Sequence, residues 1–353
     1  SNTAVSFAAK AVDRWFSLRM ELVGNTIVLA AALLGLLGGA GSSSWAAAKS
    51  AIAVTQALSV VGLLNWTVRT VAQTETAFTS FQRVVDVLDA TEVEAPKMLP
   101  SDSEIPSVWP SNGRVVFHNV SLRYSSDLPL VLQGVDLELR PGERVGVIGR
   151  TGSGKSTLLR ALLRTVEVSE GTVEVDGLDI RSLGLARLRS AVTAIPQDNF
   201  LVTGSVRQNV DPRGEHTDDE VRRALESASL GKWLLERHMQ ASGGDVSPGE
   251  KQLLGVARAI LRGSKVVALD EVTSRVDEAT DRQVQLALQR LPTGTTLLVV
   301  SHRIKTLQDY DTVVVMEAGR VVEMGDPRDL SSDPKSRFAA MLAAEQTGEL
   351  LDA

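Results

Sequence analysis

Two long stretches without charged residues, Leu22–Ala48 and Ser50–Val68, stand out in the N-terminal part of the chain. Both are rich in Leu, Ala, Val and Ile, and each reaches the roughly 20 residues that a helix needs to cross a ~30 Å hydrocarbon core. Gly38–Ser44 carries a turn signal between them, so the pattern predicts an antiparallel pair of membrane helices. Their content of Ala and Gly leaves a pair of buried helices in a soluble protein as the alternative.

Basic residues are distributed unevenly around these two stretches. Arg14 and Arg19 precede the first stretch and Arg69 follows the second, whereas Lys49 stands alone in the turn. Because Lys and Arg are enriched on the cytoplasmic side of membrane helices, both outer ends are expected in the cytoplasm. The pattern then stays helical and becomes amphipathic as far as about Asp89.

These features predict that residues 1–91 are the C-terminal part of a transmembrane domain. The chain opens with Ser and not Met, within the expected first helix, so we expect it to be part of a longer protein. Residues 92–112 contain four prolines among acidic residues and serines, which is typical of a linker.

From residue 113 the pattern changes to short apolar strands that alternate with helical segments. Helices are expected at Lys155 to about Arg164, Asp218–Gln240 and Leu253–Arg262. From Arg114 apolar residues alternate as in a strand, at Val115, Phe117, Val120 and Leu122. Further strand-like segments are Val131–Leu139, Arg144–Ile148, Thr172–Val175, Val192–Ile195, Lys265–Leu269, Thr296–Val300 and Thr312–Met316. This alternation predicts an α/β domain with a mainly parallel sheet over residues 113–353.

Composition excludes several classes of function. The chain of 353 residues is 43% hydrophobic and 23% charged, which is close to globular averages. A net charge of −6 and the lack of a basic tract argue against a nucleic-acid partner. The chain has no cysteine, so disulfides, thiol catalysis and cysteine-ligated zinc are excluded.

A glycine-rich segment between the strand Arg144–Ile148 and the helix from Lys155 fits the phosphate-binding loop pattern. Its glycines allow consecutive backbone N–H groups to turn inward at a helix N-terminus, which makes an anion site. Lys155 is expected to reach the β- and γ-phosphates, and the Ser156 hydroxyl to ligate Mg²⁺. The expected ATP-binding residues here are Gly149, Arg150, Thr151, Gly152, Ser153, Gly154, Lys155, Ser156 and Thr157.

Polar residues follow three further expected strands. Asp270 and Glu271 end an apolar strand, where Asp270 can hold Mg²⁺ through water and Glu271 can orient or deprotonate the attacking water. Gln197 follows another strand and is expected to sense the metal or the water. His302 follows a third and is expected to contact the γ-phosphate. A lone Gln or His is usually solvated or structural, so these two assignments rest on chain order.

Ser247 and Gly249 precede the expected helix Leu253–Arg262. A serine and a glycine at a helix N-terminus can bind an anion, and we include both residues in the expected ATP site. Ser247 followed by Glu250 fits an ordinary helix cap equally well.

Six motifs stand in the order of ABC transporter ATPase domains: the phosphate loop, Gln197, Ser247–Gln252, Val266–Glu271, Ser274–Asp277 and Ser301–His302. Trp109–Pro110, Ile195–Asp198 and Asn209–Pro212 resemble the second nucleotide-binding domain of the C subfamily, the multidrug-resistance-associated proteins. Arg14–Trp15 and Gly62–Trp66 look like the last two membrane helices of that family. The resemblance implies an ATPase that drives transport, with ATP and Mg²⁺ as cofactors, and it implies that Tyr124 stacks on adenine.

The signature departs from the family pattern Leu-Ser-Gly-Gly-Gln. Val246 replaces Leu, Pro248 replaces the first Gly and Glu250 replaces Gln. Proline removes a backbone donor, and Glu250 adds negative charge beside a phosphate site. In this family each ATP lies between one domain's phosphate loop and the other domain's signature, so the resemblance implies a second nucleotide-binding domain as partner.

The resemblance also suggests the cargo. Arg14, Asn65, Trp66 and Arg69 match residues that line a pocket for conjugated organic anions in multidrug-resistance-associated proteins. Arg and Trp also favour membrane interfaces, so an anchoring role is the alternative. We expect an integral membrane exporter of small amphipathic anions, in a plasma or vacuolar membrane, with its ATPase domain in the cytoplasm. An ATP-gated channel or channel regulator of the same subfamily, and a soluble ABC ATPase, stay open as alternatives.

Overall fold

The computed structural model describes residues 2–38, 44–91, 93–197, 199–240, 244, 246–270, 278–301 and 303–347. It divides the chain into two compact units, residues 1–93 and residues 94–353.

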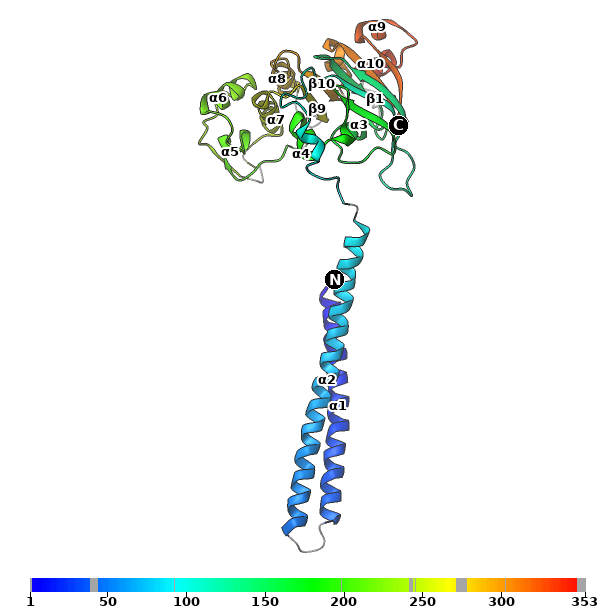
Figure 1. Ribbon diagram of the computed structural model, residues 1–353, viewed down its shortest axis with the longest axis vertical. Helices are drawn as coiled ribbons and strands as arrows, with labels where there is room; N and C mark the ends of the chain where they lie inside the picture. Colours follow the sequence, from blue (N-terminus) through cyan, green and yellow to red (C-terminus); the bar gives the residue numbers. More distant parts are fainter. Residues whose placement is uncertain are drawn as a thin grey trace. The chain divides into compact units, whose positions relative to one another are not determined.

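The first unit consists of the helices α1 (Asn2–Gly38) and α2 (Ser44–Ala90), which run antiparallel and side by side (Figure 1). They approach closely at Gly24, where a Cβ atom would lie 2.3 Å from Cγ1 of Val61. The segments Lys10–Leu37 and Ala51–Ala90 are long and apolar enough to cross a membrane. Arg14 and Arg19, which precede the first uncharged stretch, lie within α1, because the helix is continuous from Asn2.

The second unit is an α/β fold, as the sequence predicts. Its larger sheet holds the strands β3 (Arg144–Ile148), β6 (Val192–Ile195), β9 (Val266–Asp270), β10 (Thr296–Val300), β11 (Thr312–Glu317) and β12 (Arg320–Gly325). The strand order is β12-β11-β3-β10-β9-β6, and every neighbouring pair is parallel except β11–β12. Three predicted strands, β3, β6 and β10, have the predicted bounds.

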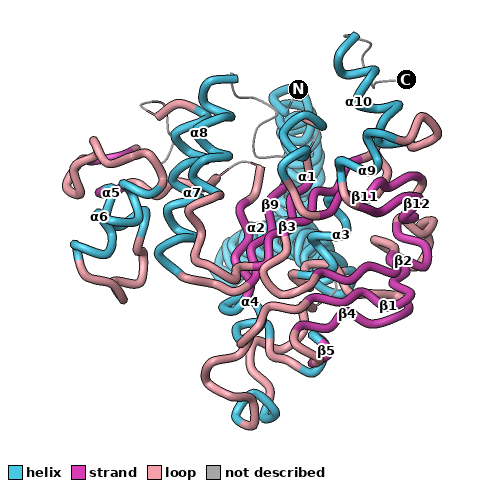
Figure 2. Tube along the Cα trace, turned by 90° about the horizontal axis from the view of Figure 1, so that it is seen from above, coloured by secondary structure: helices cyan, strands magenta, loops and turns pink. Residues whose placement is uncertain are grey.

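Helices follow or cover these strands. They are α3 (Lys155–Leu162), α4 (Leu185–Ala191), α5 (Val206–Val210), α6 (Asp218–Ser227), α7 (Pro248–Arg262), α8 (Glu278–Leu288), α9 (Pro327–Ser332) and α10 (Arg337–Thr347). Three short 3₁₀ helices are η1 (Pro100–Ser103), η2 (Ile180–Ser182) and η3 (Ile304–Asp309). Figure 2 shows α7 beside α8, with α5 and α6 on the far side of α7.

Both faces of the central strands β3, β9 and β10 are buried, which explains their continuous apolar runs. Alternate residues of β9 belong to different cores: Val267 and Leu269 pack with α7 and α8, whereas Val266 and Ala268 pack with α3 and β1. The period-2 side-chain alternation of a strand therefore builds two cores, one on each face.

A second sheet was not expected from the sequence. It is antiparallel, has the order β2-β1-β4-β5, and packs its apolar side chains into the core on the α3 side. Its strands are β1 (Val115–Leu122), β2 (Leu132–Leu139), β4 (Glu170–Val175) and β5 (Leu178–Asp179).

The expected helix Asp218–Gln240 is also too long. Helix α6 ends at Ser227, and Ser229 has a φ of +63°, which a helix cannot accommodate. The chain then turns into the short strand β8 (His238–Met239), which pairs with β7 (Gly204–Ser205).

Residues 94–112, expected to be a linker, lie within the second unit and contact it directly. The carbonyl oxygen of Pro96 accepts a hydrogen bond from Leu185 N at 3.1 Å, and that of Lys97 accepts one from Ala186 N at 2.9 Å. Asp102 accepts from Gly184 N at 2.9 Å. These contacts hold the start of α4, the helix that leads into β6.

Candidate nucleotide site at the carboxyl edge of the sheet

The loop between β3 and α3 has a backbone that glycine must supply. Gly152 and Gly154 have φ values of +80° and +100°, in the region that L side chains rarely adopt. At Gly149 a Cβ atom would lie 2.2 Å from the carbonyl oxygen of Met316. The glycines therefore allow the tight turn, and the loop packs directly against β11.

Lys155, the first residue of α3, folds back over this loop. Its side chain is only 5% exposed, and Nζ donates to the carbonyl oxygens of Gly149 at 2.8 Å and Arg150 at 3.0 Å. The hydroxyl oxygen of Ser153 is buried without a hydrogen-bond partner. A buried lysine and an unpaired hydroxyl beside a glycine-rich helix start fit the phosphate groups of a nucleotide. Arg150 and Thr151 at the tip of the loop are exposed.

The two expected magnesium ligands from different strands contact each other. Ser156 Oγ donates to Asp270 Oδ1 at 2.8 Å, although the residues are 114 positions apart. In the part of the chain that the structure describes, no group of three or more His, Cys, Asp or Glu could hold a metal. A hydroxyl and a carboxylate, completed by water and nucleotide oxygens, fit Mg²⁺, which prefers few protein ligands.

Strand order explains why the other expected residues come near this pair. β3, β10, β9 and β6 are parallel neighbours, so their carboxyl ends share one edge of the sheet. Val300 is in register with Val147 and with Asp270, and Leu269 with Ile195. The edge therefore carries the phosphate loop, Asp270 and Gln197. Glu271 and His302, which follow β9 and Ser301, lie outside the described residues, as do Asp198 and Ser274–Asp277.

Tyr124 lies against the first turn of α3. Its hydroxyl is 2.9 Å from Thr157 Oγ1, and its side chain is 39% exposed. Arg160 donates to the same hydroxyl at 2.7 Å, with its guanidinium 5.6 Å from the ring centroid. Arg160 was not predicted from the sequence, because only the fold brings α3 beside the segment after β1. Adenine stacking by Tyr124 stays a prediction.

The signature segment begins α7 earlier than expected, at Pro248 and not at Leu253. Ser247 caps the helix: its Oγ accepts from Glu250 N at 3.2 Å, while Glu250 Oε2 accepts from Ser247 N at 2.9 Å. This is the capping box that the sequence allowed. Pro248 occupies the first helical position, where proline costs the helix nothing. Ser247 is exposed, so a cap and a contact with a further anion are compatible.

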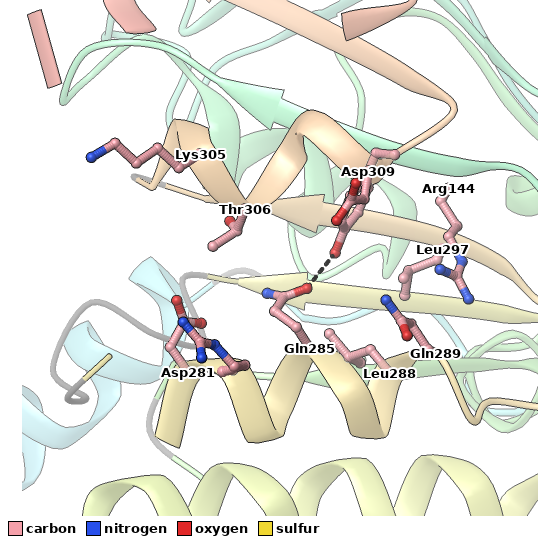
Figure 3. A pocket seen from close by; sticks show the side chains of 11 residues that line it. Arg144, Asp281, Gln285, Leu288, Gln289, Leu297, Lys305, Thr306 and Asp309 are labelled. Carbon is pink, nitrogen blue, oxygen red and sulfur yellow. Dashed lines mark hydrogen bonds between the residues drawn. The ribbon is translucent and has the colours of Figure 1, made fainter. Parts of the chain in front are cut away.

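A pocket of about 240 Å³ lies next to the segment that follows His302 (Figure 3). It is lined by Asp281 and Gln285 from α8 and by Lys305 and Tyr310 among others, and none of its lining residues belongs to the phosphate loop. Tyr310 donates to Gln285 Oε1 at 3.3 Å, and burial raises the pKa of its phenol well above the usual range. We assign no nucleotide to this pocket.

The four expected cargo residues lie on α1 and α2. Arg14, Trp66 and Arg69 are exposed and Asn65 is partly buried in the first unit. The helices are antiparallel and Gly24 faces Val61, so Arg14 lies at about the level of the turn that contains Arg69. Asn65 and Arg69 share a face of α2 at i, i+4.

Comparison with known proteins gives a consistent result. The family model described as ABC transporter matches residues 132–274. Metal resistance protein YCF1 of Saccharomyces cerevisiae is 36% identical over 348 residues, which is 97% of this chain and 23% of that protein. ATP-binding cassette sub-family C member 2 of Rattus norvegicus is 37% identical over 342 residues, or 95% of this chain and 22% of the relative. The chain thus spans about a quarter of these relatives' length.

A solved structure agrees on the fold. The structure of a bacterial Atm1-family ABC exporter with ATP bound matches 96% of this chain and 60% of its own chain, with a TM-score of 0.74 and 24% sequence identity. The phosphate loop, the Ser156–Asp270 contact and the agreement over nearly the whole chain with sub-family C members lead to one conclusion. The chain belongs to the ABC transporter family, and within it to the C subfamily.

Proposed function

We propose that this chain is the ATP-binding and ATP-hydrolysing C-terminal part of an ABC exporter, with α1 and α2 in the bilayer and the ATPase domain in the cytoplasm. The observation that carries the proposal is the hydrogen bond between Ser156 and Asp270 at the edge where the phosphate loop and Gln197 also lie. The two apolar helices and the similarity to sub-family C members over nearly the whole chain support the transport part.

In the proposed reaction, loop N–H groups and Lys155 bind the phosphates. Lys155 has two carbonyl partners in the loop and exchanges them for phosphate oxygens. Ser156, Asp270 and Gln197 would hold Mg²⁺, which supplies charge stabilisation when it is bound. Glu271 orients or deprotonates the attacking water, and His302 contacts the γ-phosphate.

A second nucleotide-binding domain is part of the proposal. Ser247, which is exposed at the start of α7, and the buried Gly249 behind it would face the nucleotide held by that domain, while its signature would face the phosphate loop of this chain. ATP binding would clamp the two domains together, and hydrolysis would release them. The fraction of the relatives' length that this chain spans leaves room for such a domain elsewhere in the complete protein.

We further propose amphipathic organic anions, such as glutathione conjugates, as the cargo. Arg14 and Arg69 would hold carboxylates and Trp66 would pack against the apolar part, with Asn65 on the same helix face as Arg69. The matching level of Arg14 and Arg69 on the two antiparallel helices supports a common binding region.

The test is ATP-dependent uptake of a glutathione conjugate into inside-out vesicles that contain the complete protein. Trp66→Ala and Arg69→Ala should each lower uptake about tenfold, since loss of a charged or well-packed contact typically costs about 1.5–3 kcal/mol. Basal ATP hydrolysis should stay unchanged. Trp45→Ala and Arg83→Ala, exposed residues elsewhere on α2, are the matched controls.

Each alternative predicts a different result, either in this uptake experiment or in extraction of the protein from the membrane. Unchanged uptake in both variants would assign Trp66 and Arg69 to the membrane interface. Passive, ATP-gated conductance without stoichiometric uptake would indicate a channel or channel regulator. Extraction of the complete protein by salt without detergent would indicate a soluble ATPase.

A further inference from the structure

Two buried amide side chains join the loop around Gln197 to the helix α7 that carries the signature. Asn199 is 9% exposed and Gln252 is 5% exposed. Asn199 Nδ2 donates to Gln252 Oε1 at 2.8 Å, and Gln252 Nε2 donates to the carbonyl oxygen of Gln197 in a short hydrogen bond. A continuous chain of hydrogen bonds therefore runs from Asn199 through Gln252 to the backbone of Gln197.

The direction of these hydrogen bonds follows from the last acceptor, the carbonyl oxygen of Gln197. The carbonyl oxygen of Gln197 can only accept, so Gln252 must present its Nε2 to it. Its Oε1 then faces Asn199, which must present Nδ2. Both amide orientations are thereby fixed by hydrogen-bonding requirements.

Packing adds a second constraint at the same place. A Cβ atom on Gly255, in the next turn of α7, would lie 2.7 Å from Asn199 Nδ2, 2.8 Å from Asn199 Oδ1 and 2.9 Å from Ile195 Cγ2. Glycine is unfavourable inside a helix, and here it gives the amide of Asn199 room against the helix backbone. Neither the loop nor α7 can shift without leaving buried polar groups unpaired.

We propose that Asn199 and Gln252 are positioning residues that couple the two nucleotide contacts of this domain. Gln197 serves the ATP on this domain's own phosphate loop, whereas Ser247, at the start of α7, faces the ATP of the partner domain. The amide chain makes the loop and the signature helix move together, so that hydrolysis at one site depends on occupancy of the other. The inference rests on the proposed function, in which the signature serves a second domain.

Gln252→Glu tests these hydrogen bonds without changing the shape of the side chain. The carboxylate has no proton to donate to Gln197, so two oxygens face each other when it is ionised. Burial beside a carbonyl oxygen raises the pKa of such a carboxyl group. Once protonated, the acid donates to Gln197 and accepts from Asn199, and the chain of hydrogen bonds is restored.

In the complete protein in vesicles, kcat of Gln252→Glu for ATP at pH 8 should be roughly 5- to 50-fold below wild type, as expected for one buried unpaired group. The ratio to wild type should approach one as the pH is lowered to about 6. The Kd of each phosphate loop for ATP should stay within about twofold of the wild-type value, while the Hill coefficient for ATP should fall. The return of activity by titration of one sample excludes irreversible misfolding as the cause.

Three further variants sharpen the comparison. Gln252→Leu should lose activity at every pH, because leucine cannot be rescued by a proton. Gln208→Glu, an exposed capping residue of α5, changes the same chemical group and should keep the wild-type pH profile. Asn199→Asp breaks the other link and should show the same return at low pH.

Wild-type kcat in Gln252→Glu at pH 8 would overturn the proposal. A loss of kcat in Gln252→Glu that is equal at all pH values would overturn it too, since it would indicate packing and not hydrogen bonding. Failure of the proposed function looks different: the wild-type protein itself would then neither bind nor hydrolyse ATP.

Discussion

Pro248 and Glu250 weaken the signature as an anion site while they improve it as a helix start. Pro248 at the first helical position removes an N–H group, and Glu250 adds a negative charge near Ser247. We expect two copies of this chain, each offering its own signature, to bind ATP but hydrolyse it slowly. The double variant Pro248→Gly/Glu250→Gln should hydrolyse ATP faster.

The magnitude follows from the groups that change. A hydrogen bond to a charged group contributes about 1.5–3 kcal/mol, and 1.4 kcal/mol corresponds to a factor of ten. The restored N–H alone therefore allows an increase of about 10- to 150-fold, and exposure of Ser247 favours the lower end. Gln keeps the capping box, so the Glu250→Gln change by itself should alter the free energy of unfolding by less than about 1 kcal/mol.

The assay is phosphate release by the detergent-solubilised chain over a range of protein concentrations, because two copies must meet. Pro248→Ala restores the N–H without the flexibility of glycine and should share the gain. Pro327→Ala is the matched control, since Pro327 also starts a helix but lies at α9. If the double variant is no faster at any protein concentration, the signature does not limit hydrolysis and the reasoning fails.

Two further predictions concern catalysis and stability. Glu271→Gln should still bind a fluorescent ATP analogue but release phosphate about 10²–10⁴-fold more slowly, whereas Lys155→Ala should weaken binding itself; near-wild-type turnover would remove Glu271 from the mechanism. Burial raises the pKa of Asp176, but backbone N–H groups that include Asn112 and Arg114 outweigh it and lower the pKa below its ordinary value. Asp176 therefore stabilises the fold above about pH 4, and this contribution is lost as the pH falls through the lower folded pKa. In urea unfolding, Asp176→Asn should have a lower free energy of unfolding than wild type at pH 7, and this free energy should depend less on pH between pH 5 and 3. The same pH dependence in both proteins would contradict this.

The proposed coupling through Asn199 and Gln252 gives a further prediction for the signature variant. Strengthening the signature acts on the partner's ATP, whereas Glu271→Gln acts on the ATP of this domain. If the amide chain couples the two contacts, combining Gln252→Glu with the improved signature should give less than the product of the separate effects at pH 8. The pair lies in one hydrogen-bonded network, where non-additive effects are expected.

The sequence alone determined the α/β class, the two apolar helices and the phosphate loop, because each depends on local periodicity or on residues close together in the chain. β3, β6 and β10 were predicted with their observed bounds, since buried parallel strands are short apolar runs with polar ends. The length of α6 was overestimated, because the helix ends at Ser227 and Ser229 has a positive φ.

Contacts between distant residues were decided by the tertiary structure. Strand order brings Ser156 to Asp270 across 114 positions. The placement of α3 sets Arg160 against Tyr124, and the approach of Asn199 to Gly255 joins the loop to α7. Such contacts carry no periodic signal along the chain, because a hydrogen bond or a close approach depends on the distance in space between side chains and not on their separation in sequence.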